Sequence, residues 1–218
     1  MKKKIIKGVL LLAMAVLFLT GCSRNNVEGY VEGVLNATYK GDYAKYIHLT
    51  KCSQSEAQNL HAERIDECMK ALEDLQISDD LKEQYRQFFQ KELETVRFTV
   101  NGKKKEKGGY NVEVSVEPYS MFQGVDQELE QKVDKYSTEV TEAALKGTPF
   151  PDENQLREKV YELLLEILND HMNHITYGEA ETINIHVTEG KHQSYSIDGS
   201  ELKKLDKKLV NLKELGLE

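Results

Sequence analysis

The hydrophobic residues of this chain recur with two different periods, and this alternation of periods limits the fold. Spacings of three and four residues, typical of amphipathic helices, mark residues 27–40, 42–49, 53–75, 79–94, 123–146, 152–173 and 200–212. Strict alternation, typical of half-buried strands, marks residues 96–101, 110–117, 183–187 and 194–198. An isolated hairpin is barely stable in water, so we expect the two hairpins to join in one sheet. The prediction is an α+β fold in which long amphipathic helices pack on a small antiparallel sheet made of two hairpins.

The first residues have the organisation of a secretory signal. Four lysines, at positions 2, 3, 4 and 7, precede an unbroken apolar run of 11 residues from Val9 to Leu19. A basic start, a short apolar core and small residues before a cleavage point are typical of a signal peptide. The core is shorter than the roughly 20 apolar residues that a membrane-spanning helix needs.

The segment Leu19-Thr20-Gly21-Cys22 ends this signal and resembles the lipobox of bacterial lipoproteins. The resemblance implies a diacylglyceryl group on the Cys22 sulfur and cleavage of residues 1–21. Residues 22–26 would then be a short lipid-anchored tether, and residues 27–218 a single α+β domain at the outer face of the cytoplasmic membrane. Two acyl chains suffice for stable anchoring, whereas one is marginal. The alternatives are an ordinary secretory signal or a membrane anchor with a buried cysteine.

The charge of the chain limits its partners. Lysine and arginine number 29 against 37 acidic residues, a formal charge of −8, and loss of the signal with its four lysines lowers this to −12. Nucleic-acid binding needs a basic face to neutralise phosphates, so no nucleic-acid partner is expected. We also expect anionic headgroups to repel the mature body, leaving only its lipid to hold it at the membrane.

The mature part loosely resembles uncharacterised Gram-positive lipoproteins with a cystatin-like, nuclear-transport-factor-2-like fold. The resemblance is carried by Tyr30 to Tyr43, a helix that ends in Lys40-Gly41-Asp42 and leads into a tyrosine-containing helix. It implies a cone-like arrangement of helices and sheet. Residues 123–146 and 152–173 depart from the simple cone, since they insert two helices between the hairpins. Cones host enzymes, ligand binders and interaction modules, so the resemblance implies no activity.

Cys52 and Cys68 are predicted to be free thiols. Ser53 and Glu56 have the spacing of a capping box that opens the helix containing Cys68. In a continuous helix the two cysteines lie about 24 Å apart, whereas a disulfide needs α-carbons within about 7 Å. A bridge would require a break near Ala62.

No catalytic residue, cofactor or metal is predicted. His171 and His174 share one helix face, and His186 and His192 on the second hairpin could approach them. No further ligand has a fixed spacing, so a solvated helix end is the favoured interpretation. The apolar faces of the strands carry no charged residue, and no GxSxG or CxxC motif is present.

Two further clusters leave alternatives open. Residues 101–109 are expected to form a glycine-bounded loop with four lysines, between Lys103 and Lys107. That loop either touches anionic lipid or teichoic acid or is a soluble tip that discourages edge pairing, and the second is favoured. Tyrosines 30, 39, 43 and 46 either line a groove for a ligand or peptide or pack a helix pair, and packing is favoured.

These features favour a non-catalytic binding or interaction module at the cell envelope, with an unknown protein or small molecule as partner. One alternative is a small-molecule or peptide binder that assists a transporter. A less favoured alternative is a cone-fold hydrolase or isomerase, which would need a perturbed ionisable residue in a pocket.

Overall fold

A computed structural model describes residues 19–22, 26–190 and 194–209 of the chain. Its helices are α2 (Val27–Lys40), α3 (Ala44–Thr50), α4 (Gln54–Glu73), α5 (Asp79–Glu94), α6 (Val125–Leu145), α7 (Glu153–Asn173) and α8 (Gly199–Leu209). Its strands are β1 (Leu19–Cys22), β2 (Arg97–Glu106), β3 (Gly109–Glu117), β4 (Glu181–Glu189) and β5 (Ser194–Ile197). The α+β prediction is therefore confirmed. Residues 210–212 of the expected last helix lie outside the described residues.

The strands form one antiparallel sheet in the order β1-β5-β4-β3-β2. The two predicted hairpins join through β3 and β4, where Val112 pairs with Ile185 and Val114 with Ile183. The sheet also has a fifth strand that the sequence did not predict. Leu19 to Cys22, the segment that resembles a lipobox, pair with β5 at the sheet edge, with Leu19 opposite Ile197 and Cys22 opposite Ser194.

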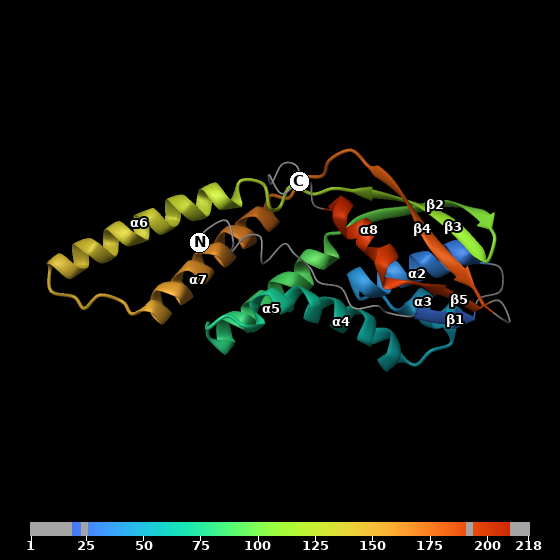
Figure 1. The fold of residues 1–218 in the computed structure, drawn as a ribbon, viewed down its shortest axis with the longest axis horizontal. Helices are drawn as coiled ribbons and strands as arrows, with labels where there is room; N and C mark the ends of the chain where they lie inside the picture. The colour runs from blue at the N-terminus through green and yellow to red at the C-terminus, as the bar shows by residue number, and fades with distance from the viewer. Residues whose placement is uncertain (1–18, 23–25, 191–193, 210–218) are drawn as a thin grey trace.

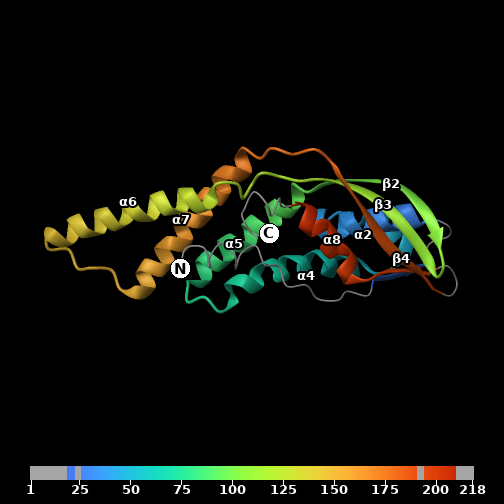
Figure 2. The same ribbon diagram turned by 45° about the horizontal axis from the view of Figure 1, so that its top comes forward.

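The helices of the body lie against one face of the sheet (Figures 1 and 2). The inward side chains of β3, β4 and β5 are almost fully buried beneath α2 and α8. Helix α3 packs closely on α2, because a β-carbon at Gly33 would lie 3.1 Å from the backbone nitrogen of Tyr46. Helix α2 ends at Gly41, whose φ of 62° is the left-handed conformation that suits glycine.

The lysine-rich segment is a strand and not a loop, which corrects the expectation for residues 101–109. Strand β2 continues through Lys103, Lys104 and Lys105 to Glu106, after a bulge between Val100 and Gly102. The bulge lets the strand keep its pairing with β3 although the apolar alternation has stopped. The connection is a short turn at Lys107 and Gly108, where the φ of Gly108 is 88°.

Helices α6 and α7 form a hairpin that projects from the body along the long axis of the molecule (Figure 1). At the base of the hairpin Val125 and Leu129 are buried, whereas no other residue of α6 is fully buried. Helix α7 continues the core through Leu164, Ile167 and Leu168 in its second half. The sheet and the hairpin tip therefore occupy opposite ends of the molecule.

Candidate functional site

The tip of the α6–α7 hairpin exposes apolar side chains. Leu145, the last residue of α6, is 84% exposed, and Phe150 in the connection to α7 is 61% exposed. Gly147, with a φ of 94°, and two prolines fix this connection. Large apolar side chains displayed together on a projecting element mark an interaction surface more often than a scattered single residue does.

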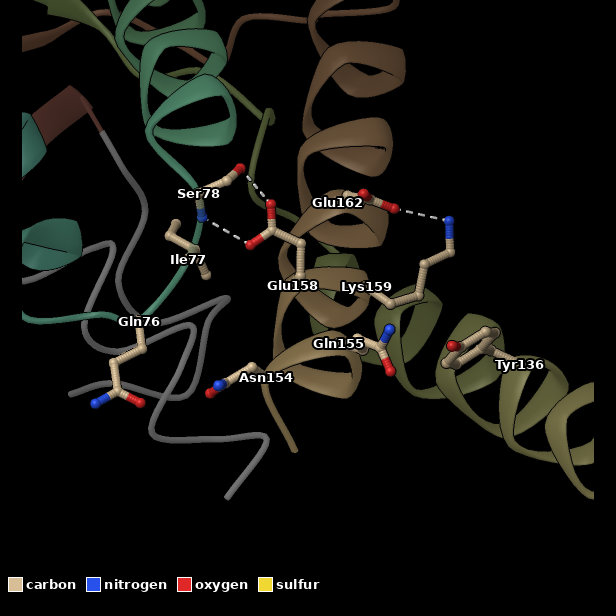
Figure 3. A pocket seen from close by; sticks show the side chains of 9 residues that line it. All are labelled: Gln76, Ile77, Ser78, Tyr136, Asn154, Gln155, Glu158, Lys159 and Glu162. Carbon is tan, nitrogen blue, oxygen red and sulfur yellow. Dashed lines mark hydrogen bonds and ion pairs between the residues drawn. The ribbon is translucent and has the colours of Figure 1, made fainter. Parts of the chain in front are cut away.

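A cleft of about 810 Å³ lies at the junction between the hairpin and the body (Figure 3). It lies away from the sheet, among the connection between α4 and α5, the middle of α6 and the first half of α7. Its lining residues are mostly polar: Gln76, Ile77, Ser78, Tyr136, Asn154, Gln155, Glu158, Lys159 and Glu162. The carbon stems of these side chains nevertheless form most of the lining surface, so the cleft combines apolar surface with polar groups, as ligand sites usually do.

The polar groups of the cleft are largely engaged with one another. The backbone N–H of Ser78 donates to Glu158 at 2.8 Å, and the Ser78 hydroxyl donates to the same carboxylate. Gln155 completes the capping box of α7 with Asp152. Lys159 pairs with Glu162 at 2.9 Å. The cleft therefore contains a joint between the hairpin and the body, in which Glu158 of α7 accepts hydrogen bonds from Ser78, the N-cap residue of α5.

A second cluster of polar groups lies buried in the body, and sequence analysis did not predict it. The guanidinium of Arg64 on α4 lies 2.6 Å from Asp206 on α8 and 3.4 Å from Glu67. The Tyr39 hydroxyl of α2 donates to the same Asp206 oxygen at 2.7 Å. These contacts join three helices through polar groups that are largely or fully buried.

Glu92 of α5 is a further buried carboxyl, and the charge of Arg64 acts on it. Burial raises its pKa to about 7, although a hydrogen bond from the Tyr119 hydroxyl and the charge of Arg64 oppose the shift. Burial also raises the pKa of Asp206, and Arg64 opposes that shift too. The sequence signal was available, because Arg64 occupies the apolar stripe of its helix between Leu60 and Cys68. A buried stripe that includes an arginine predicts a buried carboxylate partner.

The predicted site residues lie apart from one another. His171 is half-buried at the base of the hairpin, with Nδ1 2.8 Å from the Met121 carbonyl and Nε2 2.9 Å from Glu128. His174 is exposed, and His192 lies outside the described residues. Across the described part of the chain, no three His, Cys, Asp or Glu side chains are grouped closely enough to hold a metal ion.

The tyrosine cluster packs the core. Tyr30, Tyr39 and Tyr46 are buried, and the ring of Tyr30 lies 6.4 Å from that of Tyr46 and 5.7 Å from that of Tyr195. The packing alternative is therefore confirmed for these three residues.

Both cysteines of the body are free, and α4 is continuous from Gln54 to Glu73 with the predicted capping box at its start. Burial raises the pKa of the Cys68 thiol to about 12, so this cysteine stays protonated and is a poor nucleophile. The Cys22 side chain is not described. In the part of the chain that is described, no helix is both long and apolar enough to cross a membrane.

Comparison with known proteins identifies a similar fold and no family. No protein-family model matches the chain, and no curated protein matches it. The fold is similar to the crystal structure of YcdA from Bacillus subtilis, which is described as a candidate lipoprotein, with a TM-score of 0.55 and 13% sequence identity. The similarity covers 84% of this chain and 55% of YcdA, so this chain spans about half the length of that protein. At this identity the similarity concerns the fold alone.

Proposed function

We propose that this protein is a lipid-anchored interaction module of the cell envelope that engages a partner protein through the tip of its α6–α7 hairpin. The observation that carries the proposal is the exposure of Leu145 and Phe150 at the end of a hairpin that projects from the body. Such side chains lose favourable burial unless a partner covers them.

The charge of the hairpin indicates what kind of partner fits it. Residues 125–173 carry 12 acidic and five basic side chains, a formal charge of −7. A complementary partner offers an apolar pocket for Leu145 and Phe150 with lysines or arginines at its rim. Opposite charges around an apolar contact speed association and set its orientation.

The anchor rests on the N-terminal sequence. The lipobox at Leu19 to Cys22 supports cleavage after residue 21, a diacylglyceryl group on Cys22, a tether over residues 22–26 and a single domain over residues 27–218. The similarity to YcdA, itself described as a candidate lipoprotein, supports this placement at the outer face of the cytoplasmic membrane. The packing of α2 across β2 and β3 supports kinship with the cystatin-like cones.

A ligand-binding role that assists a transporter is supported less well. The polar side chains of the described cleft that could hold a ligand, Glu158, Lys159 and Gln155, are already engaged within the protein. An enzymatic role has less support still, because Glu92, the buried carboxyl with the raised pKa, lies in the packed interior and does not line the cleft.

A photoreactive amino acid at Thr148, between the two apolar tip residues, tests the proposal in living cells. We expect one discrete adduct with a partner protein, and its loss in the double variant Leu145→Ser with Phe150→Ser. The tip variant should unfold at the same urea concentration as the unmodified chain, because both side chains are exposed.

The matched control is Lys135→Ser with Glu139→Ser, two exposed residues on the shaft of α6. This control should keep the adduct. An adduct that survives the tip variant, or that the shaft variant removes equally, contradicts docking through the tip. An adduct between two copies of this chain contradicts a heterologous partner.

A further inference from the structure

The charges of this acidic protein are unevenly distributed along its length. The hairpin at one end carries a formal charge of −7, whereas residues 103–107 at the turn between β2 and β3 carry four lysines and one glutamate. Figure 1 shows the hairpin tip and this turn at opposite ends of the long axis. The nine residues of β3 separate the turn from the hairpin base by about 30 Å, and the 21 residues of α6 add a similar length.

Two separate sets of contacts place the predicted lipid anchor, Cys22, near Lys103 and Lys105. On the C-terminal side of the tether, Glu28 in the first turn of α2 pairs with Lys103 at 3.0 Å. On the lipobox side, Cys22 is paired with Ser194, and the Ser194 carbonyl accepts from the N–H of Gly190. Residue 189, next to Gly190, is the glutamate that pairs with Lys105.

This proximity holds after cleavage of the signal peptide. Asn26 caps α2, and Cys22 precedes it by only four residues. Four residues of extended chain span at most about 14 Å. The lipid on Cys22 therefore enters the bilayer close to residues 103–107, which we call the lysine turn. This holds for any path that the tether takes.

We infer that the lysine turn between β2 and β3 is a docking surface for anionic phospholipid headgroups, and that it orients the anchored molecule with the hairpin tip pointing away from the membrane. The inference rests on the anchor proposed above and is independent of the partner at the tip. This inference revises the expectation that anionic headgroups repel the whole body. The membrane surface attracts the lysine turn while it repels the acidic hairpin.

Two of the lysines are available for this contact. Lys103 and Lys105 pair with Glu28 and Glu189. Lys104 and Lys107 are exposed, and no described residue forms an ion pair with either. Lysines held near an anionic bilayer are attracted to it, and the attraction decays within about 10 Å at 0.1 M salt. The tether, at most about 14 Å long, lets these lysines come within that range.

The orientation is measured by energy transfer from a fluorescent amino acid at Thr148 to headgroup-labelled lipid, using the full chain lipidated in cells and reconstituted in vesicles. With phosphatidylglycerol in the vesicles we expect low transfer, because the tip points outward. With phosphatidylcholine alone, or at 1 M salt where screening acts within about 3 Å, the preference should be lost and transfer should rise.

The double variant Lys104→Gln with Lys107→Gln should show the higher transfer even with phosphatidylglycerol. The matched control, Lys135→Gln with Lys146→Gln on the hairpin, should behave as the unmodified chain. Equal transfer in both lipids, or a lipid dependence that the turn variant leaves undiminished, overturns the inference. Co-flotation of the chain with the vesicles reports the anchor separately, so a missing anchor is distinguished from a missing orientation.

Discussion

At the scale of single residues, Arg64 holds together charges that the fold has removed from water. Its guanidinium faces Asp206 and Glu67, and its Nε and the second Asp206 oxygen have no hydrogen-bond partner among the described residues. Breaking a buried ion pair from one side leaves an uncompensated charge in the interior. The arrangement therefore specifies how α4 and α8 meet, at a cost in desolvation.

Arg64→Met tests this role. We expect the variant to lose about 3–5 kcal/mol of unfolding free energy, because Asp206 and Glu67 stay buried without their partner. Arg86→Met is the matched control, since Arg86 forms an exposed pair with Asp66 at 2.6 Å. The control should lose no more than about 1 kcal/mol. Urea unfolding followed by circular dichroism measures both, and similar losses would contradict the role assigned to Arg64.

Glu92 makes stability depend on pH. Its pKa is about 7 in the folded protein against an ordinary value of 4.5. Between these pH values the folded state retains a proton that the unfolded state has released, so stability falls as the pH rises through this window. The loss reaches up to about 3 kcal/mol above pH 7.

Glu92→Gln removes this dependence, because an amide cannot ionise and still accepts the hydrogen bond from Tyr119. Urea midpoints at pH 5, 6, 7 and 8 should fall less for this variant than for the unmodified chain. Glu94→Gln, at an exposed position of the same helix, should follow the unmodified chain. Parallel curves for all three proteins would contradict the assignment.

At the scale of elements, the α6–α7 hairpin is held to the body by buried apolar side chains in the second half of α7 and by polar contacts in its first half. Helix α6 packs chiefly on α7, and α7 meets α5 through the buried contact between Tyr85 and Tyr161 and through the joint between Glu158 and Ser78. Glu158→Ala removes both hydrogen bonds that this carboxylate accepts. Amide hydrogen exchange should then accelerate in the first half of α7 and at the start of α5, while the sheet stays protected.

Glu162→Ala is the control for this joint, since among the described contacts Glu162 pairs only with Lys159, a partly exposed residue of the same helix. It should leave exchange in α5 unchanged. Equal acceleration by the two variants would show that Glu158 does not join the hairpin to the body.

The sequence predicted elements better than it predicted what joins them. Helical spacing located α4 and its capping box at Ser53, because apolar period and cap chemistry are local. Alternation ended at Val100, so it missed the continuation of β2, where a bulge and lysines replace the apolar pattern. Asp206 was not assigned to a site because its partner lies 142 residues away in sequence. Contacts at that separation are set by packing, which no local pattern encodes.

At the scale of the whole molecule, the proposed function depends on the lysine turn facing the membrane and the hairpin tip facing a partner protein. The sequence predicts the anchor, but it could not place the proposed anchor beside the lysine turn or the tip of the hairpin at the far end. Those relations come from the register of the sheet and from the direction of α6. The proposed cleavage after residue 21 would remove Leu19, Thr20 and Gly21 from the sheet, so that β5 would become its edge.

The most direct test of a molecule anchored at one end is the intact mass of the chain extracted from the membrane of a Gram-positive host. We predict a chain that begins at Cys22 and carries a diacylglyceryl group, and we predict that Cys22→Ser abolishes both the processing and the lipid. A chain that retains residues 1–21 without lipid would contradict the account, because β1 would then stay in the sheet and no acyl chains would hold the lysine end at the membrane.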